Sequence, residues 1–336
     1  MKNSFFLFLI FFSSIFYGYS IQEVPQKIII DGFTQNTYYR VTYYAKDSLA
    51  TKQEIESFLG NFLKTASLWE KESIIAKINR NEITELNEDF MVIFHTAEKV
   101  SQLTNGAFDI TVGKLVNAWG FGIKTGKSPT PEQVDSMIRF VGYQKIKIID
   151  RRIVKEYPEI EIDFNAIAKG YSVDLMANFL ISKGINNFLV DIGGEIRASG
   201  AAPNGDIWLL GIENPSENSA SERQVQEIIQ LTGKSVATSG SYRKYIEKDG
   251  VRFSHTIDPK TGYPVSHHLL SATVIADDCI TADALATAFM VMGEKKAMQF
   301  LNNHPEYDAY FIVADEIENL KICYSKGFQK YFYSID

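Results

Sequence analysis

Two oxygen-bearing side chains, Asp283 and Thr287, stand four residues apart in the segment CITADALATAFMVMG. On a helix this spacing places both side chains on one face, and the alanines around them leave space for a ligand. One carboxylate and one hydroxyl, completed by backbone carbonyls and water, suit Mg²⁺, which takes few protein ligands and keeps several waters. The alternative is that Thr287 bonds back to its own helix and Asp283 is only a favourable charge near the helix N-terminus.

The segment RFSHTIDPKTGYPVSHH, residues 252–268, holds three of the five histidines around a turn. Asp258 starts the turn, the following proline presets φ, and Gly262 allows a positive φ. We expect a hairpin that leaves His255 beside a rigid turn, where an imidazole can act as a general base or bind phosphate. The alternative is a hairpin with a surface histidine. A zinc site fits poorly, because the sequence has no HExxH motif or cysteine pair.

Two further segments combine aromatic residues with features of close packing. The segment NGAFDITVGKLVNAWGFG, residues 105–122, joins Asp109 to four glycines, which indicates backbone that must approach something closely. An irregular core loop is the alternative. In ASLWEKESIIAKIN, Trp69 precedes Ser73, which is expected to cap a helix. The indole of Trp69 can either stack on a ring system or pack in the core.

The elements that must position these residues mix strands and helices. The strands are expected over 36–45, 208–213, 252–257, 271–275 and 309–314, and the helices over 51–66, 88–103, 166–183 and 281–292. The segment 159–184 is expected to pass from an alternating strand to the third of these helices, closed by Gly184. The pair Gly193–Gly194 indicates a hairpin turn, and neither a GxGxxG nor a GxxxxGK[ST] motif occurs. We therefore predict an α+β fold with mixed or antiparallel sheets and packed helices rather than regular βαβ winding.

Composition narrows the class of protein. The chain has 336 residues, of which 45% are hydrophobic and 22% charged. A chain of this length and composition can form a substantial core, or two packed subdomains, without disulfides or metals to stabilise the fold. Its net charge of -7 comes without a lysine or arginine cluster, which argues against nucleic acid as a partner. Only Cys279 and Cys323 are present, and we expect both to be free thiols because two cysteines make no disulfide framework.

The first twenty residues, MKNSFFLFLIFFSSIFYGYS, place a lysine before an apolar run that ends in small residues. This pattern predicts a secretory signal peptide over 1–20, followed by one functional domain over 21–336. The apolar run is shorter than the ~20 residues that a membrane-spanning helix needs. No cysteine follows the run, so a lipid anchor is not expected.

Taken together, the motifs occur in a familiar order, and the sequence resembles the FAD:protein FMN transferase, or ApbE-like, family. The segments that carry the resemblance are SLWEKESIIAKIN (67–79), GAFDITVGKLVNAWGFG (106–122), IDFNAIAKGYSVD (162–174), DIGGEI (191–196), ATSGSYRKY (237–245), SHTIDPKTGYPV (254–265) and ADALATAFMVMG (282–293). The resemblance implies the fold of that family and its activity. Its members cleave FAD and join the FMN part, through a phosphoester, to a threonine or serine hydroxyl of a target protein, releasing AMP with the help of Mg²⁺.

The resemblance also implies roles for individual residues. Mg²⁺ would be bound by Asp283, Thr287 and the backbone carbonyl of Ala166, with Ala286 where some relatives carry a second acid. The residues expected to contact FAD are Gln35, Trp69, Ala107, Phe108, Asp109, Asp163, Lys169 and Ile257. Gln35 stands where the family usually has a methionine, and Lys114 where a proline is common. On the resemblance, His255 is the candidate for accepting the proton of the attacking hydroxyl or for holding the phosphate, and Asp258 for orienting it.

Family membership would make the protein an exported, periplasmic enzyme, in agreement with the signal peptide. Its partner would be a flavoprotein subunit of a membrane redox complex, with peripheral membrane association. Three alternatives use the same sequence differently: a Mg²⁺-dependent FAD pyrophosphatase that releases FMN and AMP to water, an exported FAD-binding protein without chemistry, and a structural module of the cell envelope. A metal at the diphosphate argues against storage alone, and the seven ordered motifs argue against the structural module.

Overall fold

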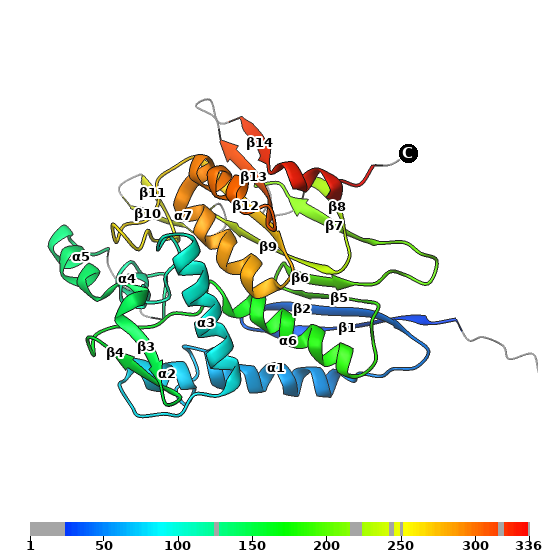
Figure 1. Ribbon diagram of the computed structural model, residues 1–336, viewed down its shortest axis with the longest axis horizontal. Coiled ribbons are helices and arrows are strands. Elements are labelled where there is room, and N and C mark those ends of the chain that lie inside the picture. Colours follow the sequence, from blue (N-terminus) through cyan, green and yellow to red (C-terminus); the bar gives the residue numbers. More distant parts are fainter. Residues whose placement is uncertain are drawn as a thin grey trace, which may run out of the picture.

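A single large antiparallel sheet organises the computed structural model, which describes residues 24–123, 128–215, 224–241, 245–248, 251–314 and 319–334. The sheet has eight strands in the order β1-β2-β5-β6-β9-β12-β13-β14 (Figure 1). These are β1 (Gln26–Thr34), β2 (Thr37–Ala45), β5 (Phe188–Ile192), β6 (Glu195–Ser199), β9 (Lys234–Gly240), β12 (Leu269–Ala276), β13 (Asp308–Ala314) and β14 (Leu320–Tyr324). Three separate hairpins pair β3 (Ile146–Ile149) with β4 (Arg152–Lys155), β7 (Trp208–Glu213) with β8 (Val225–Leu231), and β10 (Tyr245–Lys248) with β11 (Val251–Ser254).

Helices cover one face of the sheet. The helices of the described residues are α1 (Lys52–Ala66), α2 (Ile74–Asn79), α3 (Glu88–Leu103), α4 (Gly113–Ala118), α5 (Pro131–Met137), α6 (Ala168–Ser182) and α7 (Cys279–Asn303), and the short 3₁₀ turns are η1 (Ile138–Phe140), η2 (Tyr143–Lys145) and η4 (Lys326–Tyr331). Helices α6 and α7 pack against each other and on the central strands, and α3 packs on α7 (Figure 1). The opposite face is covered by β7, β8 and η4, whose Leu210, Ile229 and Phe328 pack on sheet residues. The α+β fold with an antiparallel sheet and packed helices is thus confirmed.

The helix ends follow from the local sequence. The Thr51 side chain caps α1, and Glu54 bonds back to the Thr51 backbone N–H, which completes a capping box. Ser73 caps α2 by accepting from the Ala76 N–H, as predicted. The helix expected over 88–103 has those bounds, and α6 ends beside Gly184, where φ is +78°. Glycine is the residue that adopts this left-handed conformation without strain.

Helix α7 is broken at Gly293, whose φ is +73°. Its first half therefore ends where the sequence predicts a helix end, after Met292. The His267 ring lies at this break, with Nε2 2.6 Å from the Met290 carbonyl and Nδ1 accepting from the Leu269 N–H at 3.3 Å. Both bonds require the neutral ring with its proton on Nε2. Burial lowers the pKa of His267, which favours the same neutral form.

One of the predicted strands is wrong, and another is displaced. The segment 159–164 is not a strand; it makes one isolated bridge, between Val112 and Glu161. Its alternating pattern arises because every second residue of this loop, Ile160, Ile162 and Phe164, is apolar and buried. The strand predicted over 252–257 is displaced, because β11 ends at Ser254 and pairs with β10 rather than with the residues after the turn. The predicted hairpin turn at Gly193–Gly194 is confirmed between β5 and β6.

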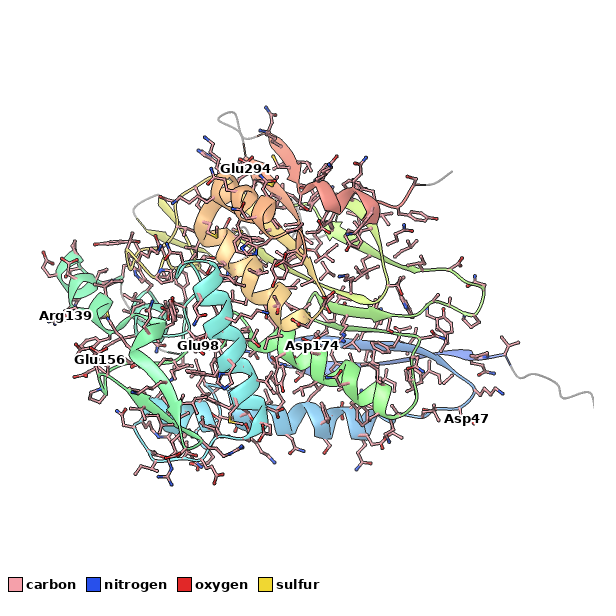
Figure 2. All side chains as sticks on the ribbon, in the orientation of Figure 1. Asp47, Glu98, Arg139, Glu156, Asp174 and Glu294 are labelled. Atoms are coloured by element: carbon pink, nitrogen blue, oxygen red, sulfur yellow. The ribbon has the colours of Figure 1, made fainter. Side chains whose placement is uncertain are left out.

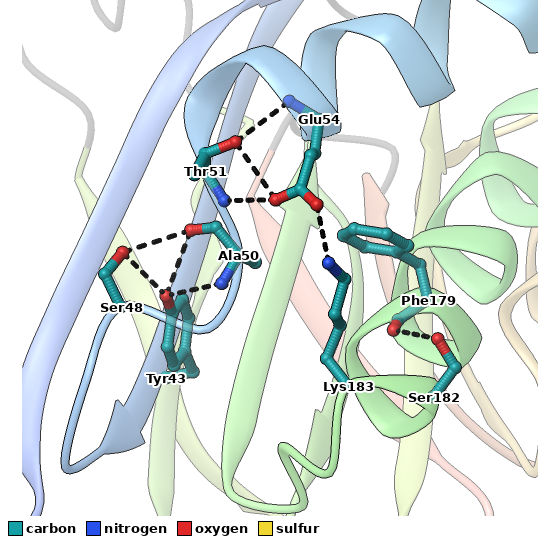
Figure 3. A network of polar contacts seen from close by, with 8 residues as sticks. All are labelled: Tyr43, Ser48, Ala50, Thr51, Glu54, Phe179, Ser182 and Lys183. Carbon is teal, nitrogen blue, oxygen red and sulfur yellow. Dashed lines mark hydrogen bonds and ion pairs between the residues drawn. The ribbon is translucent and has the colours of Figure 1, made fainter.

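A polar network near the start of α1 fixes that helix against α6 (Figure 3). One Glu54 carboxylate oxygen accepts from the Thr51 N–H and hydroxyl at 2.9 and 3.0 Å, and the other accepts from Lys183 at 2.5 Å. These donors hold the pKa of Glu54 down to about 2, with the Lys183 hydrogen bond as the largest cause. Beside it, the Tyr43 hydroxyl bonds to both backbone groups of Ala50.

The remaining predictions concern the termini and the cysteines. Cys279 and Cys323 are free thiols, as expected. The predicted signal peptide, residues 1–20, lies outside the described residues. Within the described part of the chain, no helix is long and apolar enough to cross a membrane.

Candidate active site

The site forms where the start of α6 meets the first half of α7. Gly170 permits the contact: a β-carbon there would lie 2.7 Å from the Asp283 Cβ and closer still to the Cys279 carbonyl oxygen. The Gly170 N–H donates to Asp283 Oδ2 at 2.9 Å. Asp283 is buried, with 4% of its surface exposed, so it is no surface charge at the helix N-terminus. Burial raises the pKa of its carboxyl.

That bond frees the backbone oxygen of Ala166. In a regular helix the Gly170 N–H would donate to the carbonyl four residues earlier, which belongs to Ala166, but Asp283 takes this donor instead. No hydrogen bond to the Ala166 carbonyl is found among the described residues. A half-buried carbonyl without a donor is costly unless a ligand or water satisfies it. Asp283 thus takes the N–H group that the Ala166 carbonyl would accept from in a regular helix.

Thr287 completes the oxygen-rich corner of α7. Its hydroxyl lies 3.2 Å from the Ser239 hydroxyl of β9, so its hydrogen-bond partner is outside its own helix. The described residues contain no cluster of three His, Cys, Asp or Glu side chains that could hold a metal. A carboxylate, a hydroxyl and a free carbonyl are nonetheless the donor set of a Mg²⁺ ion that keeps much of its hydration. The residues present therefore fit the ion that the resemblance implies.

A second acid, Glu195, lies beside this corner. Lys169, one residue before Gly170, donates to Glu195 Oε1 at 2.7 Å. Burial raises the pKa of Glu195 to about 7, although the Lys169 ammonium acts in the opposite direction. For Lys169, burial lowers the pKa, but the charges of Glu195 and Asp283 outweigh it and the pKa is raised. The other oxygen, Glu195 Oε2, is buried and has no hydrogen-bond partner among the residues that the structure describes.

Asp174, one turn further along α6, fixes the start of α7 (Figure 2). Its carboxylate accepts from the backbone N–H groups of Cys279 and Ile280 at 3.0 and 2.8 Å and from Arg197 at 2.7 Å. A carboxylate at this position satisfies N–H groups that a helix N-terminus leaves free and complements the helix dipole. The motif AKGYSVD therefore fixes α7 against α6 at two points: Gly170 bonds to Asp283, and Asp174 bonds to the first N–H groups of α7.

The segments around 106–122 and 160–164 lie side by side. The Asp163 N–H donates to the Ile110 carbonyl at 2.7 Å, and the Gly113 N–H to the Glu161 carbonyl at 3.1 Å. The Asp163 carboxylate accepts from the backbone and side chain of Asn165 at 2.7 and 3.2 Å, and burial raises its pKa to about 6. This carboxylate therefore shapes the loop that leads to Ala166.

Asp109 also serves its own loop. One oxygen accepts from the N–H and hydroxyl of Thr111 at 2.8 and 2.6 Å, and the other from the Tyr143 N–H at 2.7 Å. Burial raises the pKa of Asp109, against these donors. The neighbouring Ala107 and Phe108 are buried as well. Any contact of these three residues with a ligand must therefore use their exposed edges or backbone groups.

The turn after His255 is tied to the WGFG segment. The Trp119 indole N–H donates to the Gly262 carbonyl at 2.9 Å, and a β-carbon at Gly262 would lie 2.7 Å from Val134. The half-buried His255 ring lies edge-on to Phe121, with ring centroids 6.4 Å apart. Asp258 builds the turn: its side chain accepts from the Lys260 N–H at 2.8 Å and its carbonyl from the Gly262 N–H at 2.8 Å.

Further residues frame the site. Ile257, which bridges to Pro264, is buried, whereas Trp69 is 59% exposed and so does not pack in the core. Gln35 occupies a two-residue turn between β1 and β2, with φ of +48°, and its amide donates to the Ser172 hydroxyl at 2.8 Å. Ser172 in turn donates to the Lys169 carbonyl at 2.7 Å. The turn therefore touches the first turn of α6 beside Asp283.

The contacts thus join two groups of predicted residues. At the α6–α7 contact, Ser172 joins Gln35 to Lys169, and the next residue, Gly170, bonds to Asp283; Ala166 precedes this part of α6, and Thr287 follows Asp283 by four residues on α7. His255, Ile257 and Asp258 belong to the turn that packs on residues 119–121. Sequence reasoning missed Glu195, Gly170, Asp174 and Ser239. All four lie in segments quoted for the resemblance, but no spacing rule marks a hydrogen bond between residues so distant in the chain.

Comparisons with known proteins identify the family and the fold. Residues 35–311 match the model of the ApbE family. An FAD:protein FMN transferase of Vibrio cholerae is 38% identical over 286 residues, covering 82% of this chain and 85% of the relative. One from Haemophilus influenzae is 39% identical over 293 residues, covering 83% and 84%. The solved flavin transferase ApbE from Vibrio cholerae superimposes with a TM-score of 0.82 at 35% identity, over 92% of this chain and 100% of that one. The apbe protein of Thermotoga maritima gives a TM-score of 0.79 at 29% identity, over 92% and 100%.

Proposed function

The chain belongs to the ApbE family and is an FAD:protein FMN transferase, and on this premise we propose how its residues carry out the reaction. The hydroxyl of a threonine or serine in the target protein attacks the phosphorus of the FMN part of FAD. A phosphoester bond forms, the bond to the AMP part breaks, and AMP leaves with the bridging oxygen. Water in place of the hydroxyl would give FMN and AMP, the pyrophosphatase reaction.

The observation that carries the mechanism is the oxygen-rich corner between α6 and α7. Asp283, Thr287 and the free carbonyl of Ala166 would hold Mg²⁺ there. When bound, the ion would neutralise diphosphate oxygens and stabilise the leaving AMP. The protein's part in phosphoryl transfer is chiefly positioning. Gly170 and Asp174 supply it by fixing α7 against α6.

His255 is assigned the proton of the attacking hydroxyl. A neutral imidazole accepts a proton near physiological pH, and the packed turn from Asp258 to Gly262 holds the residue in place. Asp258 contributes by building this turn. Loss of a general base typically costs 10²–10⁴-fold in rate.

The remaining residues are assigned to FAD. The exposed indole of Trp69 is free to stack on the isoalloxazine ring. Lys169 provides a positive charge for the diphosphate side, and Gln35 reaches the same region through Ser172. Ala107, Phe108, Asp109, Asp163 and Ile257 shape the walls, the two acids by holding the loops that carry them.

The decisive experiment is intact-protein mass spectrometry of an acceptor flavoprotein domain after incubation with this enzyme, FAD and Mg²⁺, while AMP and FMN are followed. We expect the acceptor to gain one FMN, dependent on Mg²⁺. His255→Ala should bind FAD normally, by flavin fluorescence, but lose transfer about 10²–10⁴-fold. Normal transfer by this variant would remove His255 from the catalytic role. Free FMN and AMP with an unmodified acceptor would favour the pyrophosphatase.

We also propose that the enzyme is exported to the periplasm and acts on a flavoprotein subunit of a membrane redox complex, with peripheral membrane association. The lysine and apolar run at the N-terminus support export. N-terminal sequencing of the protein from a periplasmic fraction tests this. A mature chain beginning near residue 21 is expected, and an intact Met1 in the cytoplasmic fraction would contradict export.

A further inference from the structure

Glu195 is the buried acid that the transfer mechanism leaves without a role. It follows the Gly193–Gly194 turn at the start of β6 and is 3% exposed. Lys169 engages only Oε1, and Oε2 is buried without a partner. Leaving a buried charged acceptor unsatisfied costs more than leaving a neutral one. A donor that the loaded site brings would remove this cost.

The charges around Glu195 indicate what the donor is. Glu195 and Asp283 are joined through two consecutive residues of α6, since Lys169 bonds to Glu195 and the Gly170 N–H bonds to Asp283. Two carboxylates share one ammonium in this buried corner. When both carboxyls are ionised the excess is negative, and charge buried in a protein must be compensated. FAD brings a diphosphate and enlarges the excess, whereas a hydrated divalent cation removes it and supplies water hydrogens as donors.

We propose that Glu195 is a positioning residue of the Mg²⁺ site, which accepts a hydrogen bond through Oε2 from the hydration shell of the ion while Oε1 holds Lys169. This inference rests on the proposed function. It also gives a reason why position 286, one residue before Thr287, can be a buried alanine. The second negative charge of the site is supplied from β6 instead of from α7.

The test measures metal binding directly, without an acceptor. Mn²⁺ replaces Mg²⁺ as the probe, and free Mn²⁺ is counted by electron paramagnetic resonance as it is titrated into the full chain saturated with FAD. Glu195→Gln keeps the shape of the side chain and removes its charge. We expect its Mn²⁺ dissociation constant to rise about tenfold or more, the usual cost of losing a partner outside the ligand set.

Two further variants separate this role from a structural one. Lys169→Met breaks the same ion pair but removes a positive charge, so Mn²⁺ should bind as tightly as in the parent or more tightly, while FAD binds less well. If the ion pair only stabilises the fold, both variants weaken Mn²⁺ binding alike. Asp308→Asn is the matched control, because Asp308 is a buried acid paired with Lys330 at 3.0 Å outside the site. It should leave Mn²⁺ binding unchanged.

Three results would overturn the inference: parental Mn²⁺ affinity in Glu195→Gln, equal weakening in Glu195→Gln and Lys169→Met, or a loss in Glu195→Gln that falls on FAD alone. The last would show that Oε2 serves the nucleotide. Thermal melts of each variant report folding, and the Lys169→Met result stands even if Glu195→Gln does not fold. Failure of the parent chain to modify an acceptor would instead count against the proposed function, since this titration requires no transfer.

Discussion

Helix α6 has a lysine–glutamate ion pair at each end, and the two pairs differ in burial and in how completely their carboxylates are hydrogen-bonded. At its start, Lys169 meets Glu195, which is buried and has one oxygen without a partner. Just past its end, Lys183 meets Glu54, which is exposed to solvent and has both oxygens engaged. The satisfied pair belongs to a capping box and serves the fold. The unsatisfied pair lies beside Asp283 and serves the site.

In this protein, complete hydrogen bonding of a charged side chain separates structural charges from functional ones. A natural fold seldom leaves a buried polar atom without a partner unless a ligand or water supplies one. At the Lys183 end the protein supplies every donor itself, so the local structure is complete. At the Lys169 end the Ala166 carbonyl and Glu195 Oε2 accept no hydrogen bond from the described residues, while the neighbouring Lys169 and Gly170 donate to Glu195 Oε1 and Asp283.

The largest effect is expected from removing the carboxylate at the Lys169 end. Asp283→Ala should lower FMN transfer more than about 100-fold, because a direct metal ligand matters more than an outer partner, whose loss costs 10–100-fold. Glu54→Ala, which removes an acid at the other end, should transfer FMN at the parental rate. Initial rates of acceptor modification measure both. Equal losses of FMN transfer in Asp283→Ala and Glu54→Ala would contradict the assignment of one end of α6 to the site and the other to the fold.

An intermediate effect is expected from the glycines at the two ends. Gly170→Ala should destabilise the protein by about 1–3 kcal/mol through overpacking, since the new methyl group meets Asp283 and Cys279, and it should also reduce transfer by displacing α7. Gly184→Ala has open space but a φ of +78°, so it should cost about 1–2 kcal/mol of backbone strain and leave transfer intact. Denaturant unfolding and rate measurements on both variants test this, and an unaltered rate in Gly170→Ala would contradict it.

The smallest effect is expected from the pH response of Glu54. Its folded-state pKa is depressed from 4.5 to about 2, so its stabilising contribution is present above pH 4.5 and is lost as the pH falls toward 2. In Glu54→Gln this contribution is absent at every pH. The difference in melting temperature between the parent and this variant should therefore be small, because the pair is exposed, and should shrink on acidification. A difference that grows toward pH 2 would reverse the sign and refute the assignment.

Much of the fold was accessible from the sequence because its signals are local. The boundaries of α3 and of strand 208–213 were predicted correctly, since they depend on periodicity and on stop signals within a few residues. The helix predicted over 281–292 likewise ends where α7 breaks, next to Gly293. Strand 159–164 failed because burial in an irregular loop can alternate as it does in a strand. The displacement of β11 depends on its partner β10, which local pattern does not identify.

The candidate site divides in the same way. Asp283 and Thr287 could be paired from helical spacing alone, and the side chains are on one helix face as predicted. Spacing along the sequence could not identify Glu195, because its partner Lys169 is on another element. The packing of α6 on the sheet brings the two residues together. The absence of a donor at Oε2 is a property of the folded molecule and leaves no trace in residue types.

The His267 ring, which bonds to the last turn of α7 before its break, connects two parts of the candidate site. His267 follows the turn that begins at His255, and its ring bonds to the Met290 carbonyl at the end of the half-helix that bears Asp283 and Thr287. The chain from His267 to Met290 and this one hydrogen bond form a closed loop that contains the two proposed metal ligands, Asp283 and Thr287, and His255 lies twelve residues before the loop in the sequence. A single imidazole, remote from the reacting atoms, therefore fastens the end of the half-helix that bears Asp283 and Thr287 to the segment that follows the His255 turn.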